Sequence, residues 1–402
     1  MKVKITLDKP HIVSLGPTVE EAGWGTHQFP AINTDDDGNI GISFHGAKDL
    51  IEAYGTEPYL NISYDKGCTW KEVALAEVSY TKARFGTKLP NGDRYLVETR
   101  APIETDASKL PEPLPFYHDF LKYYPVENIP DSMLDKRWRY LVLEKGKNIP
   151  EYKYLDFDKT GLCITASNGS LVPPFPFGRI RVDNEGTVWQ TSYGRSRNPD
   201  NLGFSPYYNA HYYVFSKDCD YIYQKSWIPY VPDTRIFNNA FNAEGFCESD
   251  ISFLKDGSCI TLMRTGSNTP SFLSRSTDKG YTWSKPVLFD DKGVWPCLCM
   301  LPCNVLLASY GRPGFYIRAT ADPTGLYWDA PIELITPNDR TLERNTPISI
   351  YNWTSRVGTC SYSDMIALDE NTAMVVYSDF FVPDEKGIKR KAILARKIHV
   401  DV

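Results

Sequence analysis

Apolar and polar positions along the chain form a repeated hairpin pattern. A short apolar strand is followed by a polar turn rich in Asp, Asn and Gly, and then by a second apolar strand. The pattern occurs six times, and its copies begin at Phe29, Arg84, Phe177, Glu248, Trp295 and Ser361. Asp-Gly, Asn-Gly and Glu-Gly pairs in the turns favour tight β-hairpins. Because helical periodicity is scarce, the pattern predicts an all-β chain made from one repeated unit.

A second motif, S-x-D-x-G-x-T-W, follows some of the hairpins. Full copies are SYDKGCTW (63–70) and STDKGYTW (276–283), and degenerate copies lie at 216–223 and 320–328. In such a turn the Asp side chain accepts bonds from backbone N–H groups, and Gly takes a positive φ. The Trp ring is expected to pack the turn against a neighbouring sheet. The motif therefore predicts a fold and not a chemistry.

These two patterns together resemble the sialidase superfamily, whose Asp-box turns decorate six-bladed β-propellers. The resemblance implies a single domain over residues 1–402, with four-stranded antiparallel blades around an axis. The last blade has three evident strands, so residues 3–14 are expected to pair with 391–400 and close the ring. Residues from about 101 to 159 are rich in Pro and aromatics. They do not fit a bare four-stranded blade, so we interpret them as an insertion in blade two. Long loops in compact folds commonly serve function.

Composition narrows the class of protein. The 402 residues carry 44 Lys and Arg against 50 Asp and Glu, a net charge of −6, and 42% are hydrophobic. Disorder is excluded, and the absence of a basic run argues against a nucleic-acid partner. No apolar stretch is long enough to span a membrane or to form a signal peptide, so we expect a cytoplasmic protein. The nine cysteines lack zinc-site spacing, and neither a metal nor a cofactor is expected.

Polar residues at the strand ends predict a ligand site. In a propeller the starts of the innermost strands and the ends of the second strands meet at one end of the axis. The residues at these positions include Gln28, His45, Arg195, Glu248, Arg264, Arg312, Tyr362 and Asp364. Acids, arginines and a tyrosine in one funnel indicate a polar ligand, and an oligosaccharide is the partner we expect.

The resemblance to sialidases implies individual roles. Tyr362 in SYSDMIAL matches the family's nucleophile, and Glu248 matches the residue that takes the tyrosine proton. Asp49 lies where the family carries its general acid/base. Arg264 and Arg312 match two members of the arginine triad that binds the substrate carboxylate. A phenol suits this chemistry because an anionic carboxylate nucleophile would be repelled by the carboxylate of sialic acid, which arginine forks bind in a bidentate way.

One position departs from the family pattern. The first triad arginine belongs to a Phe/Tyr-Arg-Ile-Pro motif, but residues 27–30 read His-Gln-Phe-Pro, with Gln28 at the arginine position. Gln28 can donate a hydrogen bond but carries no charge, and each lost charge-assisted bond costs about 1.5–3 kcal/mol. Together with His45, Arg195 and Asp364 we assign Gln28 to substrate binding.

Three functions are compatible with this site. The first is a sialidase-like exo-glycosidase that removes a terminal, acidic sugar through a tyrosyl intermediate. The second is a propeller glycosidase or polysaccharide lyase on a uronic-acid or neutral glycan, with His or Tyr as acid/base; Gln28, His27 and His45 favour it. The third is a glycan-binding propeller without catalysis, since binding sites use the same groups.

Overall fold

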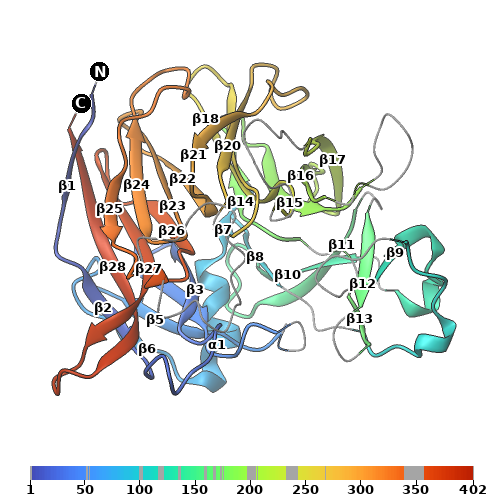
Figure 1. Ribbon diagram of the computed structural model, residues 1–402, viewed down its shortest axis with the longest axis horizontal. Helices are drawn as coiled ribbons and strands as arrows, with labels where there is room; N and C mark the ends of the chain where they lie inside the picture. The colour runs from blue at the N-terminus through green and yellow to red at the C-terminus, as the bar shows by residue number, and fades with distance from the viewer. Residues whose placement is uncertain are drawn as a thin grey trace.

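The chain folds almost entirely into β-strands. The computed structural model describes residues 2–50, 53, 55–98, 103–115, 122–134, 137–157, 161–165, 169–172, 174, 176–196, 205, 207–231, 243–267, 269–338 and 357–401. Its one described α-helix, α1 (Leu75–Thr81), is short. No described helix is both long and apolar enough to cross a membrane. Figure 1 shows the sheets around a common centre, with the two chain ends side by side at one edge.

All six predicted hairpins are confirmed. They are β3 (Gln28–Thr34) with β4 (Ile40–His45), β7 (Thr87–Lys88) with β8 (Arg94–Val97), β14 (Ile180–Val182) with β15 (Val188–Gly194), β18 (Cys247–Phe253) with β19 (Cys259–Arg264), β22 (Val294–Met300) with β23 (Leu306–Gly311), and β26 (Ser363–Ala367) with β27 (Thr372–Pro383). Three of them extend into regular four-stranded sheets. The strands that complete these sheets are β5 (Tyr59–Ser63), β6 (Lys71–Glu72), β20 (Ser271–Ser276), β21 (Val287–Asp290), β24 (Phe315–Thr320) and β25 (Ile332–Ile335).

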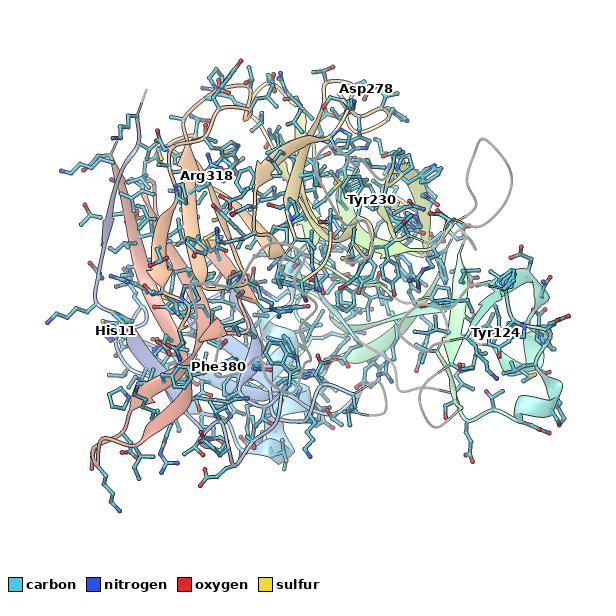
Figure 2. The ribbon with its side chains drawn as sticks, in the orientation of Figure 1. His11, Tyr124, Tyr230, Asp278, Arg318 and Phe380 are labelled. Atoms are coloured by element: carbon cyan, nitrogen blue, oxygen red, sulfur yellow. The ribbon has the colours of Figure 1, made fainter. Side chains whose placement is uncertain are left out.

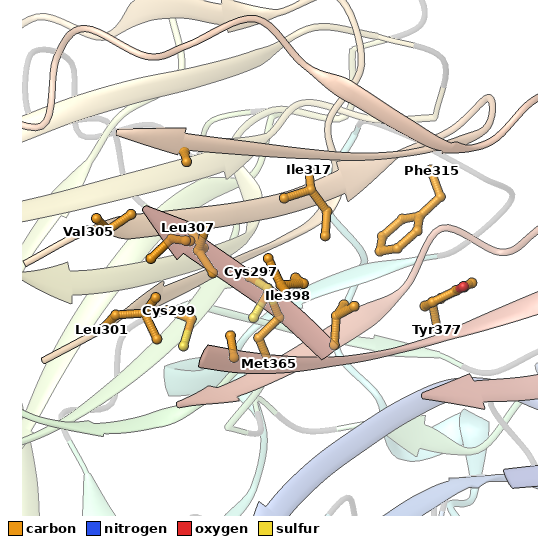
Figure 3. Packing of buried hydrophobic residues seen from close by; sticks show 14 of the residues in the cluster. Cys297, Cys299, Leu301, Val305, Leu307, Phe315, Ile317, Met365, Tyr377 and Ile398 are labelled. Atoms are coloured by element: carbon orange, nitrogen blue, oxygen red, sulfur yellow. The ribbon is translucent and has the colours of Figure 1, made fainter. Parts of the chain in front are cut away.

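The hairpins are neighbours around a ring. Strand β3 contacts β26, β26 contacts β22, β22 contacts β18, and β18 contacts β15, while β14 contacts β8. Apolar side chains fill the space between successive sheets. Figure 3 shows one such layer, in which Cys297, Leu307 and Ile317 face Met365 and Tyr377 of the next sheet. The result is an all-β fold of the propeller type.

Two neighbouring hairpins share one sheet of eight strands instead of forming separate blades. The added strands are β10 (Arg137–Leu143), β11 (Glu151–Phe157), β16 (Asn209–Phe215) and β17 (Tyr221–Ile228). Strands β11 and β17 pair in parallel through Asp156↔Tyr221 and Phe157↔Ile222. This pairing covers two edges that would otherwise expose unpaired N–H and C=O groups.

The predicted pairing of the chain ends is confirmed. Strand β1 (Lys4–Leu7) pairs with β28 (Lys389–Asp401) from Lys4↔Asp401 to Leu7↔Ile398. Strand β2 (His11–Leu15) pairs with the same strand from His11↔Ala395 to Leu15↔Ala392. The two ends therefore hold each other in the sheet that also contains β27 and β26.

The segment expected to be an insertion divides into two parts, and some of it lies outside the described residues. Its later part is not an insertion, because β10 and β11 belong to the eight-stranded sheet. Its earlier part supplies β9 (Tyr123–Pro125), which joins β12 (Leu162–Thr165) and β13 (Leu171–Val172) in a small extra sheet. This sheet has its own core around Tyr124, at the far side of the molecule from the chain ends (Figure 2).

The two S-x-D-x-G-x-T-W turns have the predicted hydrogen bonds. The Asp65 carboxylate accepts bonds from the backbone N–H groups of Cys68 and Thr69 at 3.0 and 2.8 Å. In the second copy Asp278 accepts one from Thr282 at 2.9 Å, and Gly280 has a φ of 79°. These bonds hold the pKa of Asp65 and of Asp278 at about 2, with the Thr hydroxyl bond as the largest cause.

The nine cysteines are all within the described residues, and none forms a disulfide. Six are buried in the protein interior. The cytoplasmic location expected from the sequence stays a prediction.

Candidate active site

Three innermost strands have a bulge at the same place, and each bulge turns one side chain toward the axis. The register of the strand pair shifts just after Gln28, Cys247 and Val294. The next residues, Phe29, Glu248 and Trp295, have φ values of 55°, 45° and 43°. Non-glycine residues in this conformation cost about 1–3 kcal/mol each, and such strain is concentrated at functional sites.

These side chains line a cavity of about 1000 Å³ at the axis. Its wall includes predicted site residues from four different sheets, namely His45, Asp49, Glu248, Arg264, Arg312, Tyr362 and Asp364. Half-buried aromatic rings cover much of the remaining wall. Within the described residues, no group of three or more His, Cys, Asp or Glu side chains could hold a metal ion.

Tyr362 and Glu248 form the centre of the site. The Tyr362 hydroxyl donates a hydrogen bond to Glu248 Oε1. Arg264 Nη1 donates to the other oxygen of Glu248 and lies 3.1 Å from the Tyr362 oxygen. Burial and the Glu248 charge raise the pKa of Tyr362 well above its usual value, although Arg264 and Arg312 act in the opposite direction. The phenol is therefore neutral at rest, and Glu248 is placed to accept its proton.

Asp49 faces the same cavity from the loop after β4. Trp24 Nε1 donates to Asp49 Oδ2 at 3.0 Å, and the Asp49 N–H donates to the Trp24 carbonyl at 3.0 Å. Asp49 is exposed by its accessible surface, but the groups around it in the cavity wall displace part of the water near its carboxyl. This desolvation raises the pKa of Asp49 above its usual value, against the bond from Trp24 and the nearby His45. Such a carboxyl can hold a proton for a leaving group.

The two candidate arginines share a neighbour. Ser267 accepts a bond from Arg264 Nη2 at 3.2 Å and from Arg312 Nη1 at 3.0 Å. Arg312 also bonds the Cys360 carbonyl at 2.7 Å and lies over the Trp24 ring, 4.9 Å from its centroid. Burial and the charge of Arg264 lower the pKa of Arg312. The two guanidinium groups lie close enough to share an anion, and Glu248 and Glu244 already balance part of the charge on Arg264.

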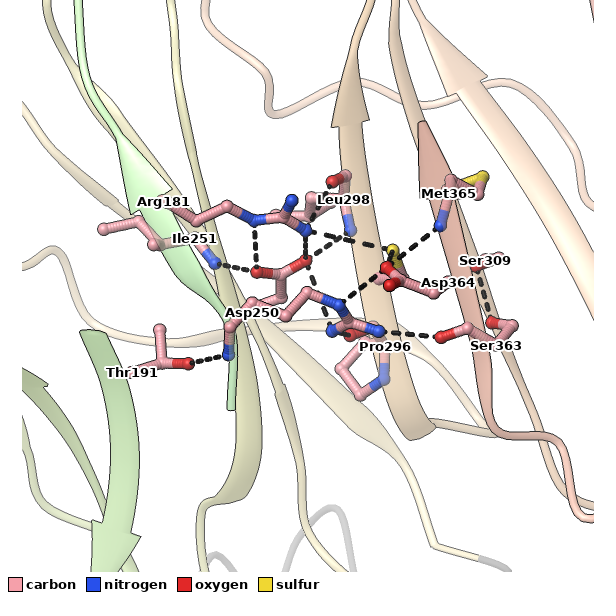
Figure 4. Close-up of polar contacts among 12 residues, drawn as sticks. Arg181, Thr191, Asp250, Ile251, Pro296, Leu298, Ser309, Ser363, Asp364 and Met365 are labelled. Atoms are coloured by element: carbon pink, nitrogen blue, oxygen red, sulfur yellow. Dashed lines mark hydrogen bonds and ion pairs between the residues drawn. The ribbon is translucent and has the colours of Figure 1, made fainter. Parts of the chain in front are cut away.

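Asp364 has a different environment from the other predicted binding residues. It belongs to a network beneath the cavity, which Figure 4 shows. Arg181 bonds Asp250 at 2.6 and 3.1 Å, and Arg179 Nε bonds Asp364 at 2.9 Å. Each carboxylate also accepts a backbone N–H from the neighbouring sheet, from Leu298 at 2.8 Å for Asp250 and from Ile32 at 3.1 Å for Asp364. Asp364 therefore links sheets together as well as facing the cavity.

Two predicted binding residues do not line the cavity. The bulge turns Gln28 into the protein, where it is fully buried and its side-chain oxygen accepts the Gly25 N–H. Phe29 faces the axis in its place. The Arg195 guanidinium lies between the rings of Tyr123 and Tyr208, 4.2 and 4.1 Å from their centroids, and so links the extra sheet to the cavity wall. A one-residue change at a bulge reverses which side chain points inward, and the sequence does not reveal it.

Several cavity residues were missed by the sequence interpretation. Glu244 bonds Arg264 Nη2 at 3.2 Å, so this arginine contacts two carboxylates. Trp24 holds Asp49. The Trp295 ring is stacked on Tyr362 with centroids 4.9 Å apart, and Phe29 contacts Tyr362 edge-on at 4.6 Å. The one signal for Phe29 and Trp295 in the sequence is that each is the first residue of a repeated hairpin.

Comparison with known proteins supports the fold. No protein-family model and no curated protein matches the chain. Among solved structures, a protein of unknown function from Dyadobacter fermentans matches with a TM-score of 0.65 at 15% identity, over 99% of both chains. The Hadza microbial sialidase Hz136 matches with a TM-score of 0.52 at 12% identity, over 96% of this chain and 68% of the sialidase. The chain therefore has the fold of a sialidase-like β-propeller.

Proposed function

We propose that this protein is an exo-acting glycoside hydrolase of the sialidase type. The single observation that carries the proposal is the hydrogen bond from Tyr362 to Glu248 in a cavity lined by charged and aromatic side chains. The similarity in fold to a sialidase is consistent with it. We count the architecture as six blades, with the eight-stranded sheet as two blades joined along β11 and β17.

The proposed mechanism has two displacements. In the first, Glu248 accepts the Tyr362 proton while the phenolic oxygen bonds to the anomeric carbon of the terminal sugar. The glycosidic bond breaks, and Asp49 gives its proton to the departing oxygen. In the second, Asp49 takes a proton from water, the water oxygen attacks the anomeric carbon, and Tyr362 leaves and recovers its proton from Glu248. Two inversions retain the anomeric configuration.

The substrate in this proposal carries a carboxylate next to the reacting carbon. Arg264 and Arg312 face the cavity and are close enough to share Ser267, so they are placed to bind that group. A phenol paired with a carboxylate attacks such a centre without the charge repulsion that a carboxylate nucleophile would meet.

Turnover of a fluorogenic α-sialoside tests the proposal directly. We expect release of the fluorophore, and proton NMR of the first product should show the α-anomer before mutarotation. A β-anomer as first product would contradict the tyrosyl intermediate. If the sialoside is not turned over, sialic acid is excluded as the substrate. Uronides and neutral glycosides would then be the next substrates to measure.

A lyase or hydrolase acting on a uronic-acid or neutral glycan is the second candidate. Phe29 occupies the inward position at the first strand, so no third arginine is found there. Glu244 adds a carboxylate to Arg264. In a lyase reaction Tyr362 or His45 would instead exchange protons with the sugar, and the product would be unsaturated and absorb ultraviolet light. That absorbance distinguishes elimination from hydrolysis.

Replacement of Asp49 by Asn should remove the acid/base without filling the cavity. We expect kcat/KM to fall about 100-fold or more for a poor leaving group, and much less for an activated aryl leaving group that needs no proton. In the wild type the raised pKa of Asp49 keeps the acid protonated to higher pH, so activity should fall as pH rises through it. The Asn variant should lose this basic limb of the pH profile. An unchanged limb would exclude Asp49 as the acid.

A further inference from the structure

One lysine side chain is fully buried outside the cavity wall, and the proposed mechanism does not use it. Lys391 lies near the start of β28. Its Nζ donates to the Gly23 carbonyl at 2.8 Å and to the Thr26 carbonyl at 3.1 Å, and it lies 5.0 Å from the centroid of the Phe380 ring. Among the described residues, no carboxylate forms an ion pair with it. A lysine is rarely buried in this way without a carboxylate, because removing its charge from water is costly.

The ionisable groups around Lys391 do not neutralise its charge. Burial lowers the pKa of Lys391 to about 8, although the nearby Cys360 thiol acts in the opposite direction. Burial and the charge of Lys391 lower the pKa of His27 to about 4. The neighbouring Arg390 pairs with Asp384 at 2.7 Å. The Lys391 ammonium is therefore held in place by backbone carbonyls and an aromatic ring.

Lys391 holds both ends of the segment formed by residues 16–27. Its backbone N–H donates to the Pro17 carbonyl at 2.9 Å, and its carbonyl accepts the Gly16 N–H at 2.8 Å. These two bonds continue the pairing of β2 with β28 into the start of the segment. The ammonium binds two carbonyls near the end of the segment. One residue of β28 therefore fixes the segment at its beginning and at its end.

The residues between those two carbonyls contact the acid and one arginine of the site. Trp24 Nε1 donates to the Asp49 carboxylate, and the Trp24 ring lies under the Arg312 guanidinium. The Trp24 carbonyl accepts the Asp49 N–H at 3.0 Å. Gly25 has a φ of 109°, and a Cβ at this position would overlap the Asp49 backbone nitrogen. Because the segment packs this closely against Asp49, a small displacement of the segment would disturb the site.

We propose that Lys391 is a positioning residue of the site, which fixes the place of Trp24. Through Trp24 it orients the Asp49 carboxyl and supports the Arg312 guanidinium. The roles of Asp49 and Arg312 rest on the proposed hydrolase, whereas the placing of Trp24 does not. A methionine side chain has a similar length and avoids the cost of a buried charge. It would lose only the two bonds to the segment, so holding the segment is what the lysine contributes.

The indole N–H signal of Trp24 in the NMR spectrum of ¹⁵N-labelled protein tests the proposal without turnover. This signal is assigned by its absence from Trp24→Phe. Lys391→Met is expected to fold, because Gly23 and Thr26 are at least partly exposed and their carbonyls can bind water instead. We expect the Trp24 signal to shift or broaden more than the other indole signals in Lys391→Met. It should stay in place in Lys397→Met, the matched control, which changes a lysine of the same strand that does not line the cavity.

The fold of Lys391→Met is measured alongside, by circular dichroism and by the melting temperature. An unchanged Trp24 signal in the folded variant overturns the positioning role. Failure of Lys391→Met to fold also overturns it, because the lysine would then maintain the fold and not the site.

Kinetics separate this inference from the proposed function. Where the α-sialoside is turned over, Lys391→Met should lower kcat/KM about tenfold or more, as for a small misplacement of catalytic groups. The bond from Trp24 lowers the pKa of Asp49, so its loss should raise that pKa and move the basic limb of the pH profile to higher pH. In a Trp24→Phe background, Lys391→Met should change kcat/KM less than about twofold, because both residues act through one contact.

Each kinetic outcome bears on one of the two proposals. If the losses from Lys391→Met and Trp24→Phe multiply fully in the double variant, or if the basic limb does not move in Lys391→Met, the positioning role is overturned and the hydrolase is left intact. A displaced Trp24 signal in a protein that does not turn over the sialoside overturns the sialidase function and leaves the placing of Trp24 by Lys391 intact.

Discussion

Replacement of Tyr362 by Phe should reduce kcat/KM on the order of a thousandfold or more, because the reacting oxygen is removed. The change keeps the ring, so its contacts with Trp295 and Phe29 are retained. Glu248 keeps its ion pair with Arg264 and loses only the phenolic donor. We therefore expect an intact fold, measured by circular dichroism and by the melting temperature, beside a loss of turnover.

Tyr310 provides a matched control for this substitution. Its hydroxyl also donates to a carboxylate, Asp290, at 2.8 Å, and the residue is buried, but it does not line the cavity. Tyr310→Phe loses the same kind of hydrogen bond and should cost about 1 kcal/mol of stability without changing kcat/KM. If Tyr362→Phe retained a tenth of the wild-type activity, Tyr362 would not be the nucleophile.

The second large effect is expected on stability, from replacement of Asp250 by Ala. This carboxylate is fully buried and bonds Arg181, while Arg179 lies 3.5 Å from it. Burial alone would raise the pKa of Asp250, but the two arginines outweigh burial and hold it below its usual value. Removing Asp250 leaves the half-buried Arg181 guanidinium without its carboxylate and Arg179 with Asp364 alone, which we expect to cost about 3 kcal/mol. Urea unfolding followed by tryptophan fluorescence measures the loss.

A surface pair supplies the comparison. Asp256 bonds Arg275 at 2.8 Å and is 55% exposed, so Asp256→Ala should cost only about 1 kcal/mol. If the two substitutions lowered the free energy of unfolding equally, the network in Figure 4 would not be a main link between the sheets. A larger loss for Asp250→Ala would show that charged groups near the axis hold the sheets together.

The sequence predicted most reliably those features that depend on residues close together in the chain. Hairpins and Asp turns depend on residues a few positions apart, so their patterns are visible in the chain. The pairing of β1 and β2 with β28 was also predictable, because a three-stranded last blade lacked one strand. The parallel pairing of β11 with β17 was not predictable, because the residues of each strand do not indicate which other strand edge it will meet.

The amino-acid sequence by itself determined the repeated strands, the turns that end them, and the tyrosine, glutamate and arginines that face the axis. Only the tertiary structure decided how those groups combine. Bulges rotate Phe29 inward and Gln28 into the protein, and Glu244 reaches Arg264. Arg195 joins the extra sheet to the aromatic wall instead of lining the cavity. A bulge changes the direction of a side chain by one position, and contacts between distant sheets depend on how all the sheets pack. Neither the direction at a bulge nor these contacts can be predicted from the pattern of neighbouring residues.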